Sequence, residues 1–433
     1  MYSNFSMVKF PESLIVNMLK ENPGLFAWLQ ASRHIWWQTP KLHIEEDEEE
    51  ERKTSWLELF FDLIFVAVIA QLSHRLAIDV SWQGIAGYVF LFIPVWWAWN
   101  AATFYNERFE VNDVRHRVFT FLKMIPVAGM AYAVHDAFGT TAAIFAWSYI
   151  LFRLILIYLW LSAGKASDPM TYAVTKRFSL GLFLAAVCWL FGLLAPMPAR
   201  IAFWGLGIIV DLGTPLTTLH LQAQMPKIST SHLPERFGLF ALMAMAESVI
   251  GVVTGASKVS HLNLMTGVVA SLGLFLSFMV WWVYSDHITM RPYRQNVWSI
   301  LAWCYLHLPL VIGITAIGAG IVHIVAAESS RLDPAASWLM CGAVAFVLFI
   351  MALIGLTAET HSHQEGVKLT FHEDLNRHYF IFKSAAVVLM LGVGLIGKYL
   401  GPILVLLLLA AIMASQGMHS LYEWVKSQME GQA

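Results

Sequence analysis

Charged residues are scarce in this chain. Aspartate, glutamate, lysine and arginine make up 13% of its 433 residues, whereas 58% are hydrophobic, and the mean hydropathy is +0.62. A water-soluble domain of this composition would expose a large apolar surface, so a soluble fold is excluded. The formal net charge of -2 argues against a nucleic-acid partner, which would require a clearly basic surface.

Cysteine is rare as well. Cys188, Cys304 and Cys341 all fall inside apolar segments and lack the spacing of a metal site. We expect buried, unpaired side chains at these positions, and we predict no cofactor.

Long apolar segments occupy most of the chain. At about 20 apolar residues per crossing, about twelve spans fit between residues 56 and 415. The sequence therefore predicts an all-α, polytopic integral membrane protein whose partner is the lipid bilayer. We expect residues 1–55 to lie in the cytoplasm or along the membrane surface, and residues 416–433 to form a cytoplasmic tail.

Elements of the first half return about 180 residues later, as in proteins built from repeats. The corresponding elements are Val95-Trp96-Trp97 with Val280-Trp281-Trp282, Glu58 with Glu235, and Pro126 with Pro309. We expect two six-helix repeats, residues 56–222 and 223–415. Because six is an even number, both repeats enter the membrane in the same direction and are parallel.

Lysine and arginine gather in the loops that follow the even-numbered spans. Positive loops stay on the cytoplasmic side. We therefore expect both termini in the cytoplasm and the protein in the inner (plasma) membrane of the cell.

Polar residues inside the spans mark candidate working sites, because an ionisable group there is costly unless it is paired or hydrated. We predict that ten such residues form an ion or solute pathway or a buried polar network. They are Glu58, Asp62, Asn100, Arg153, Asp211, Glu235, Arg236, Glu247, Asp286 and His307.

Two interpretations stay open for the candidates of the first half. Glu58 and Asp62 stand one helical turn apart and could hold a shared proton or a cation. Alternatively, Glu58 is an interfacial first-turn acid, and Asp62 alone pairs internally. Arg153 lies too deep to reach water and needs a carboxylate partner, for which Asp62 and Asp211 are the candidates. Such a pair would serve either as a structural lock or in transport.

The second half offers a similar set. Glu235 and Arg236 stand at the cytoplasmic mouth of the seventh span, and Glu247 lies deeper, on a different face of the helix. Asp286 ends the eighth span. His307 is either a packing residue or a proton acceptor.

Several of these residues belong to longer motifs. The motifs are Trp56–Leu63, Trp96–Arg108, His232–Leu239, Glu247-Ser248, Trp281-Trp282-x-Tyr284 and Tyr305-x-His307-x-Pro309. Together, over residues 54 to 400, they resemble the signature of the bacterial low temperature requirement A family of membrane proteins. The resemblance implies an integral membrane protein linked to growth in the cold, without a particular substrate or reaction.

Three function classes follow. We favour an ion- or proton-coupled transporter or channel for a small ion or solute, with its site between the halves. The alternatives are a membrane-embedded lipid-modifying enzyme and a membrane scaffold or sensor that supports growth at low temperature. Glycines in the later spans would also allow the close helix contacts of a homo-oligomer. Residues that could serve an enzyme are His74 with Asp79, Ser415 with His419, and His361 and His363 with His372.

Overall fold

The computed structural model describes residues 32, 38, 40–42, 54–110, 113–226, 231–259, 261, 263–289, 293–294, 296–327, 331–358, 361–364, 367–370 and 373–430. Within these residues, twelve helices are long and apolar enough to cross a membrane. The predicted all-α, polytopic membrane fold is confirmed. Most of the predicted surface segment, residues 1–55, lies outside the described residues.

The spanning helices of the first half are α4 (Trp56–Ile78), α5 (Trp82–Arg108), α6 (Val114–Ala133), α7 (Ala142–Lys165), α8 (Pro169–Leu194) and α9 (Ala199–Gly213). Those of the second half are α11 (His232–Ser257), α12 (Leu264–Tyr284), α13 (Val297–Val325), α14 (Pro334–Gly355), α15 (Glu373–Ile396) and α16 (Pro402–Glu430). Because α16 continues to Glu430, most of the predicted tail, residues 416–433, extends the last helix.

Short elements extend or connect these helices, and the span that begins with α9 continues through two of them to Gln222. They are the 3-10 helices η1 (Val134–Asp136), η2 (Pro215–Thr218) and η4 (Gly397–Tyr399), the single turn α10 (Leu219–Gln222) and the π-helical turn η3 (Ser285–Thr289). Two antiparallel strand pairs join β1 (Lys41–Leu42) to β2 (Phe109–Glu110), and β3 (His361–Gln364) to β4 (Val367–Thr370).

Short polar side chains fix where many of the spans begin. Each accepts a hydrogen bond from a backbone N–H of the first turn, which would otherwise lack a partner. These caps are Ser55, Ser81, Asp113, Asp168, Asn263, Asn296 and Asp333. Each cap stands immediately before the first residue of a spanning helix, so these local signals mark the helix boundaries.

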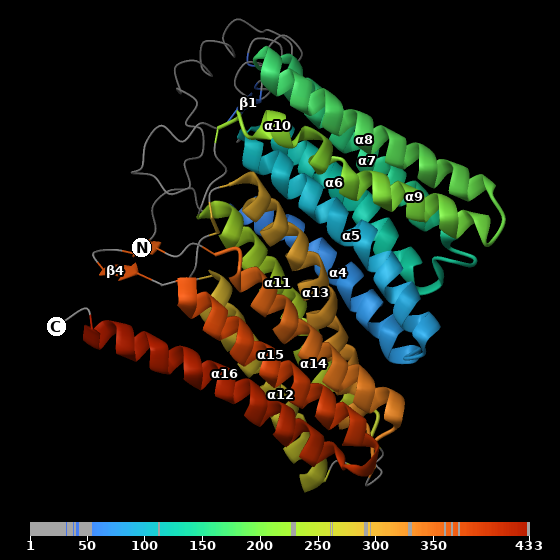
Figure 1. Ribbon diagram of the computed structural model, residues 1–433. Helices are drawn as coiled ribbons and strands as arrows, with labels where there is room; N and C mark the ends of the chain where they lie inside the picture. Colours follow the sequence, from blue (N-terminus) through green and yellow to red (C-terminus); the bar gives the residue numbers. More distant parts are fainter. Residues whose placement is uncertain are drawn as a thin grey trace, which may run out of the picture.

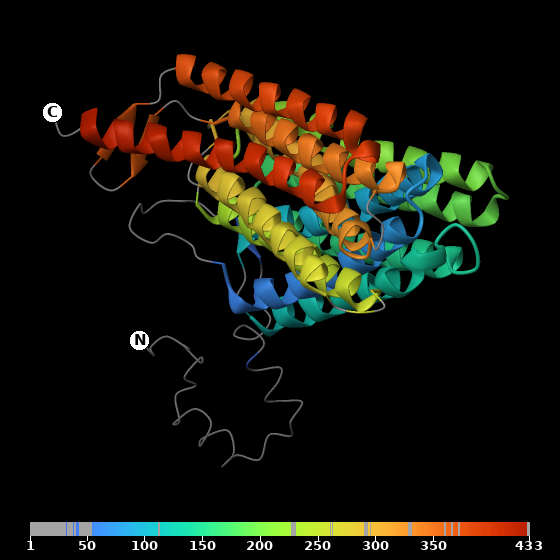
Figure 2. The same ribbon diagram turned by 90° about the horizontal axis from the view of Figure 1, so that it is seen from below.

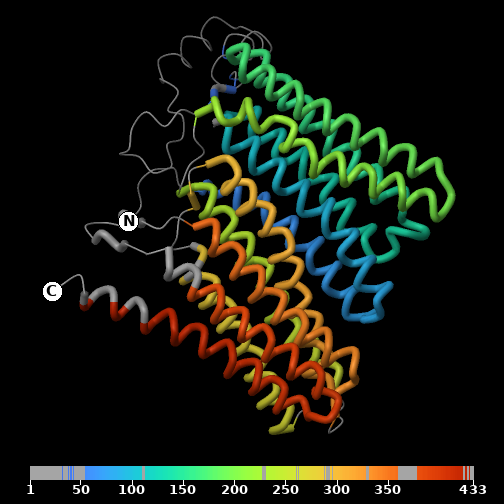
Figure 3. The backbone as a smooth tube through the Cα atoms, viewed as in Figure 1, coloured from blue at the N-terminus to red at the C-terminus, as the bar shows by residue number. Residues whose placement is uncertain are grey.

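The two halves lie side by side (Figures 1 and 2). Helices α4 to α9 form one group and α11 to α16 the other, with α4 and α5 packed against α11 and α13. Helix α4 begins and α16 ends at the same end of the bundle (Figure 3). The surface between α4, α5, α11 and α13 is where a site shared by both halves has to lie.

Helix α13 runs through the centre of the molecule. In its most apolar stretch, 83% of the residues are buried, against 33% for α12 and α15. The exposed large side chains of the outer helices, such as Phe275 on α12 and Leu389 on α15, are apolar, as contact with lipid requires. Residues buried on α13 are therefore enclosed by protein.

Two glycines bring α11 and α13 into backbone contact. A Cβ atom added to Gly251 would lie 2.5 Å from the carbonyl oxygen of Gly318, and one added to Gly318 would lie 2.7 Å from that of Glu247. Small residues permit this kind of close helix crossing in membranes. The crossing holds Glu247 against the central helix.

Candidate functional site

A single guanidinium group joins the two halves. Arg236 on α11 has one terminal nitrogen 3.0 Å from Glu58 Oε1 and the other 2.8 Å from Asp62 Oδ1, and both acids are on α4. Trp99 on α5 donates its indole N–H to Asp62 Oδ1 at 2.9 Å. Arg236 and Asp62 are fully buried, and Glu58 nearly so. The result is a buried ionic contact made by both halves.

Two four-residue spacings in the sequence produce this match. Glu58 and Asp62 share one face of α4, and His232 and Arg236 share one face of α11. Ser55 and Glu58 form a capping box, in which the Ser55 hydroxyl accepts from the Glu58 N–H at 3.2 Å and Glu58 Oε2 accepts from the Ser55 N–H at 3.0 Å. Glu58 is thus both a first-turn acid and a member of the carboxylate pair, and the two acids share Arg236.

His232 extends the contact to a third carboxylate. Its Nδ1 lies 2.6 Å from Glu107 Oε2 on α5, and its Nε2 lies 3.5 Å from Glu58 Oε2. His232 and Glu107 are both buried. Neither was predicted as a site residue, because polar residues at the ends of spans are usually solvated. The four-residue spacing from His232 to Arg236, which places both side chains on one helix face, was the sequence signal that could have identified His232.

A buried lysine completes the group. Lys123 on α6 is 1% exposed, and its ammonium lies 4.8 Å from the centre of the Phe61 ring. It is within electrostatic range of Glu58 and Asp62. A lysine inside an apolar span is itself a sign of a site, and sequence analysis passed over it. We call the set Glu58, Asp62, Glu107, Lys123, His232 and Arg236 the charge cluster.

A second ion pair lies within the first half. Arg153 on α7 is fully buried and pairs with Asp211 on α9 at 3.0 Å. The Tyr149 hydroxyl lies between them, accepting from Arg153 and donating to Asp211 Oδ2 at 2.5 Å. Of the two carboxylates predicted as partners of Arg153, the structure pairs it with Asp211, while Asp62 pairs with Arg236.

We expect Tyr149→Phe to destabilise the protein by about 1–3 kcal/mol, because Arg153 and Asp211 each lose a buried hydrogen bond while their direct contact remains. Reversible unfolding in mixed micelles measures this difference. Tyr158→Phe is the matched control, since Tyr158 is on the same helix and is exposed. Equal stability of the two variants would contradict a role for the Tyr149 hydroxyl.

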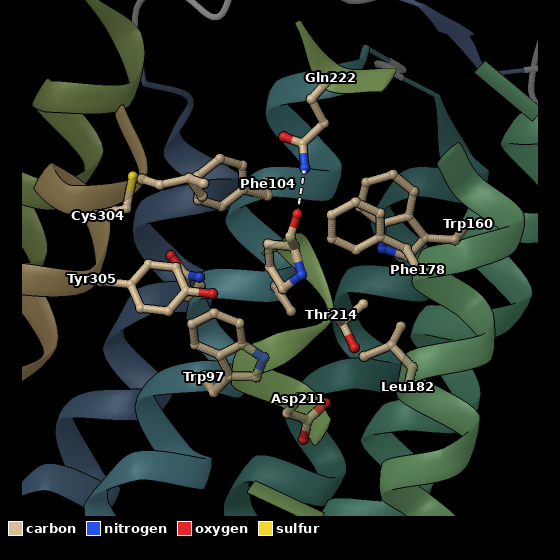
Figure 4. A pocket seen from close by; sticks show the side chains of 14 residues that line it. Trp97, Phe104, Trp160, Phe178, Leu182, Asp211, Thr214, Gln222, Cys304 and Tyr305 are labelled. Carbon is tan, nitrogen blue, oxygen red and sulfur yellow. Dashed lines mark hydrogen bonds between the residues drawn. The ribbon is translucent and has the colours of Figure 1, made fainter. Parts of the chain in front are cut away.

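A pocket with a cavity volume of about 40 Å³ lies beside this ion pair. Both halves contribute to its wall, since α13 supplies Leu301, Cys304 and Tyr305. The Tyr305 hydroxyl also donates to the carbonyl of Leu212. Figure 4 shows aromatic rings around the space, Asp211 at one end and Gln222 at the other. The ring-bearing and polar residues of the wall include Trp97, Asn100, Phe104, Trp160, Phe178, Asp211, Thr214, Gln222 and Tyr305. The structure therefore brings two predicted residues together here, Asn100 and Asp211.

The other predicted residues lie apart from the charge cluster. Glu247 is buried farther along α11. His307 on α13 is enclosed by aromatic rings, with Nδ1 bonded to its own helix at the Trp303 carbonyl (2.7 Å). Asp286 accepts from the indole N–H of Trp282 at 2.7 Å. Glu235 is exposed and accepts from the backbone N–H of Thr54.

Of the three sets of residues considered for an enzyme, two lie in the described part of the chain. His74 and Asp79 line a surface hollow, but hydrogen bonds from Ser81 hold the pKa of the exposed Asp79 carboxyl below its usual value. Ser415 donates to the carbonyl of Ile412 on its own helix. His419 packs beside the rings of two aromatic residues on α15.

The third set considered for an enzyme consists of three histidines, whose side chains lie outside the described part of the structure. His361 and His363 lie in β3, whose backbone alone is described, and His372 lies outside the described residues. In the part of the chain that is described, no group of three or more histidine, cysteine, aspartate or glutamate side chains is placed to hold a metal ion.

Comparison with known proteins identifies relatives of this chain. The family described as "Bacterial low temperature requirement A protein (LtrA)" matches residues 53–416. An uncharacterized protein of Rhizobium meliloti (strain 1021) is 27% identical over 305 residues, which are 66% of this chain and 72% of that protein. The family match covers most of the sequence, from before α4 into α16. The chain therefore belongs to the bacterial low temperature requirement A family.

Proposed function

We propose that this protein is an ion- or proton-coupled transporter or channel for a small ion or solute, and that its working site lies between the two six-helix halves. The observation that carries the proposal is the charge cluster, in which side chains of α4, α5 and α6 meet side chains of α11. Ionisable groups buried within membrane-spanning helices commonly mark ion and proton pathways.

The chemistry of the charge cluster supports proton coupling. A neutral imidazole has one N–H and can donate to one carboxylate, whereas an imidazolium donates to two. His232 faces Glu107 with one ring nitrogen and Glu58 with the other. The cluster can therefore bind and release one proton without any change in its heavy-atom positions.

The pocket beside Asp211 supports passage of a small solute. Its wall is apolar and aromatic with a few polar groups, the usual make-up of small-molecule sites. Tyr305 and Cys304 bring the second half into contact with this space. A movement of one half against the other would change the shape of the pocket and the charge cluster together.

The order of helix packing supports parallel repeats as the frame for such a movement. In residues 56–222, α4 packs on α5 and α6, and α6 to α9 pack in succession, with α5 also against α9. In residues 223–415, α11 packs on α12 and α13, and α13 to α16 pack in succession, with α12 also against α16. We further propose that the end where α4 begins faces the cytoplasm of the inner membrane, because the positively charged loops lie there.

A flux assay tests the proposal. In proteoliposomes with a pH-sensitive dye inside, ion and pH gradients are imposed one at a time on the intact protein and on Asp62→Asn. We expect a flux driven by at least one gradient, reduced about tenfold or more in Asp62→Asn, which corresponds to about 1.4 kcal/mol in the barrier.

Glu235→Gln is the matched control, because it neutralises an exposed acid next to Arg236 and should keep the flux. Size-exclusion chromatography establishes that each variant is folded. Absence of any flux with folded intact protein under every gradient would refute the transport proposal. Equal fluxes in all three proteins would remove the charge cluster from the pathway.

A further inference from the structure

One carboxylate on a membrane-spanning helix has no cationic partner in the described part of the chain. Glu247 lies on α11, about 16 Å beyond Arg236 at about 1.5 Å per residue, and is 3% exposed. Its Oε1 atom has no hydrogen-bond partner among the described residues. Within the same residues, no lysine, arginine or histidine forms an ion pair with Glu247, in contrast to Glu58, Asp62 and Asp211.

The neighbours of Glu247 are neutral oxygen groups. The hydroxyl of Ser73 on α4 is its hydrogen-bonding neighbour, and this hydroxyl also reaches the Thr315 carbonyl on α13 at 3.5 Å. Tyr88 on α5 is close to Glu247 and donates to the Ile312 carbonyl at 2.7 Å. The Thr315 hydroxyl is a hydrogen-bonding neighbour of the Tyr88 hydroxyl.

The ionisable groups on the surrounding helices do not supply a counter-ion. On α5 the nearby group is the Tyr88 hydroxyl, which is neutral at ordinary pH. On α13, His323 is hydrogen-bonded to the backbone of Ala77, and on α4, His74 is exposed. Helix α12 carries no acidic or basic side chain between its first and last residues.

An ionised carboxylate without a counter-ion in a bilayer is costly, whereas a protonated one is neutral and can both donate and accept a hydrogen bond. The backbone of Glu247 is held against Gly318 by the close crossing of α11 and α13, so the side chain cannot withdraw to water. We propose that Glu247 is an exchangeable proton site, separate from the charge cluster, with the Ser73 hydroxyl as its hydrogen-bonding partner. Its place in a transport cycle rests on the proposed function, but the binding of the proton does not.

Infrared spectroscopy tests this on the full-length protein in proteoliposomes. The spectrum of Glu247→Gln is subtracted from that of the intact protein in mildly acidic and in alkaline buffer. We expect a carbonyl band of a protonated carboxylic acid that shifts in heavy water and is lost at alkaline pH. Glutamine has the shape of the protonated acid, so this variant should fold, and Glu235→Gln should keep the band.

A labelling experiment adds a second readout. Dicyclohexylcarbodiimide modifies protonated carboxyl groups in apolar surroundings, and mass spectrometry locates the adduct. We expect modification of Glu247 at a rate that falls about tenfold per pH unit once the group is mostly ionised. Asp211, which is held in an ion pair, should be modified far more slowly.

The outcomes separate the two proposals. Absence of a pH-dependent band would overturn the proton site, even if transport is observed. Loss of the band on addition of Na⁺ or K⁺ at constant pH would also overturn it, in favour of a metal-cation site formed by the same oxygen atoms. A pH-dependent band in a protein without any flux would support the proton site while refuting transport.

Discussion

Replacing Arg236 with methionine is expected to destabilise the folded protein by about 3–5 kcal/mol. The guanidinium contacts Glu58 at 3.0 Å and Asp62 at 2.8 Å, and all three side chains are buried. Without it, two buried carboxylates would lie one helical turn apart, with Lys123 still within electrostatic range of both. Because Arg236 joins α11 to α4, the loss should loosen the contact between the halves. Reversible unfolding in mixed micelles measures the free energy.

A compensating variant distinguishes charge from packing. Arg236→Met combined with Asp62→Asn removes one charge of each sign, so we expect it to recover a large part of the lost stability. Glu235→Gln, at an exposed neighbouring position, should change stability by less than about 0.5 kcal/mol. If the double variant were as unstable as Arg236→Met alone, packing of the arginine and not its charge would be the main contribution.

Gly251→Ala is expected to destabilise the protein by about 1–3 kcal/mol, although alanine favours helices more than glycine does. The added Cβ would lie 2.5 Å from the Gly318 carbonyl oxygen, so the backbones of α11 and α13 would have to separate. Neither atom belongs to a flexible side chain, and so no rotamer change can relieve the contact. Thermal unfolding of the purified variant in detergent measures the effect.

Gly267→Ala on α12 is the matched control for this substitution. No atom lies within 4 Å of a Cβ added at Gly267, so we expect unchanged or slightly higher stability there. The two variants should thus shift stability in opposite directions. A gain of stability in both would show that α11 and α13 can move apart without cost, which would contradict the role of the crossing in holding Glu247.

The spanning helices could be predicted from the sequence because lipid imposes one simple requirement on each of them. A span needs about 20 apolar residues and an end that satisfies its backbone N–H groups. Both requirements are local. The capping box of Ser55 and Glu58, for example, satisfies backbone N–H groups at the start of α4 within four residues. The continuation of α16 to Glu430 escaped prediction, because the residues beyond the apolar segment are too polar to count as part of a span.

The ionic contacts were less predictable, because they depend on how the helices are rotated and packed. Judged by depth in the membrane alone, Asp62 and Asp211 were equally suitable as ion-pair partners of Arg153. Arg153 pairs with Asp211 because α7 packs near α9. The sequence showed that a buried Asp62 needs a cationic partner. That partner, Arg236 on α11, is 174 residues away in the chain, so local patterns could not identify it. Lys123 could have been found from its apolar surroundings, whereas Glu107 stands beside Arg108 at a helix end and looks solvated.

The enclosed position of α13 has a consequence for how the protein is made. Helices leave the ribosome in chain order, so α13 leaves it before α14, α15 and α16. At that stage the apolar surface of α13 contacts lipid. In the folded protein, 83% of the residues in its most apolar stretch are buried. Since lipid tails are as apolar as the side chains that replace them, little hydrophobic energy drives the exchange. The later step, in which lipid leaves α13 and α14 covers it, depends on close packing, and this makes the late assembly of the second half sensitive to the fluidity of the surrounding bilayer.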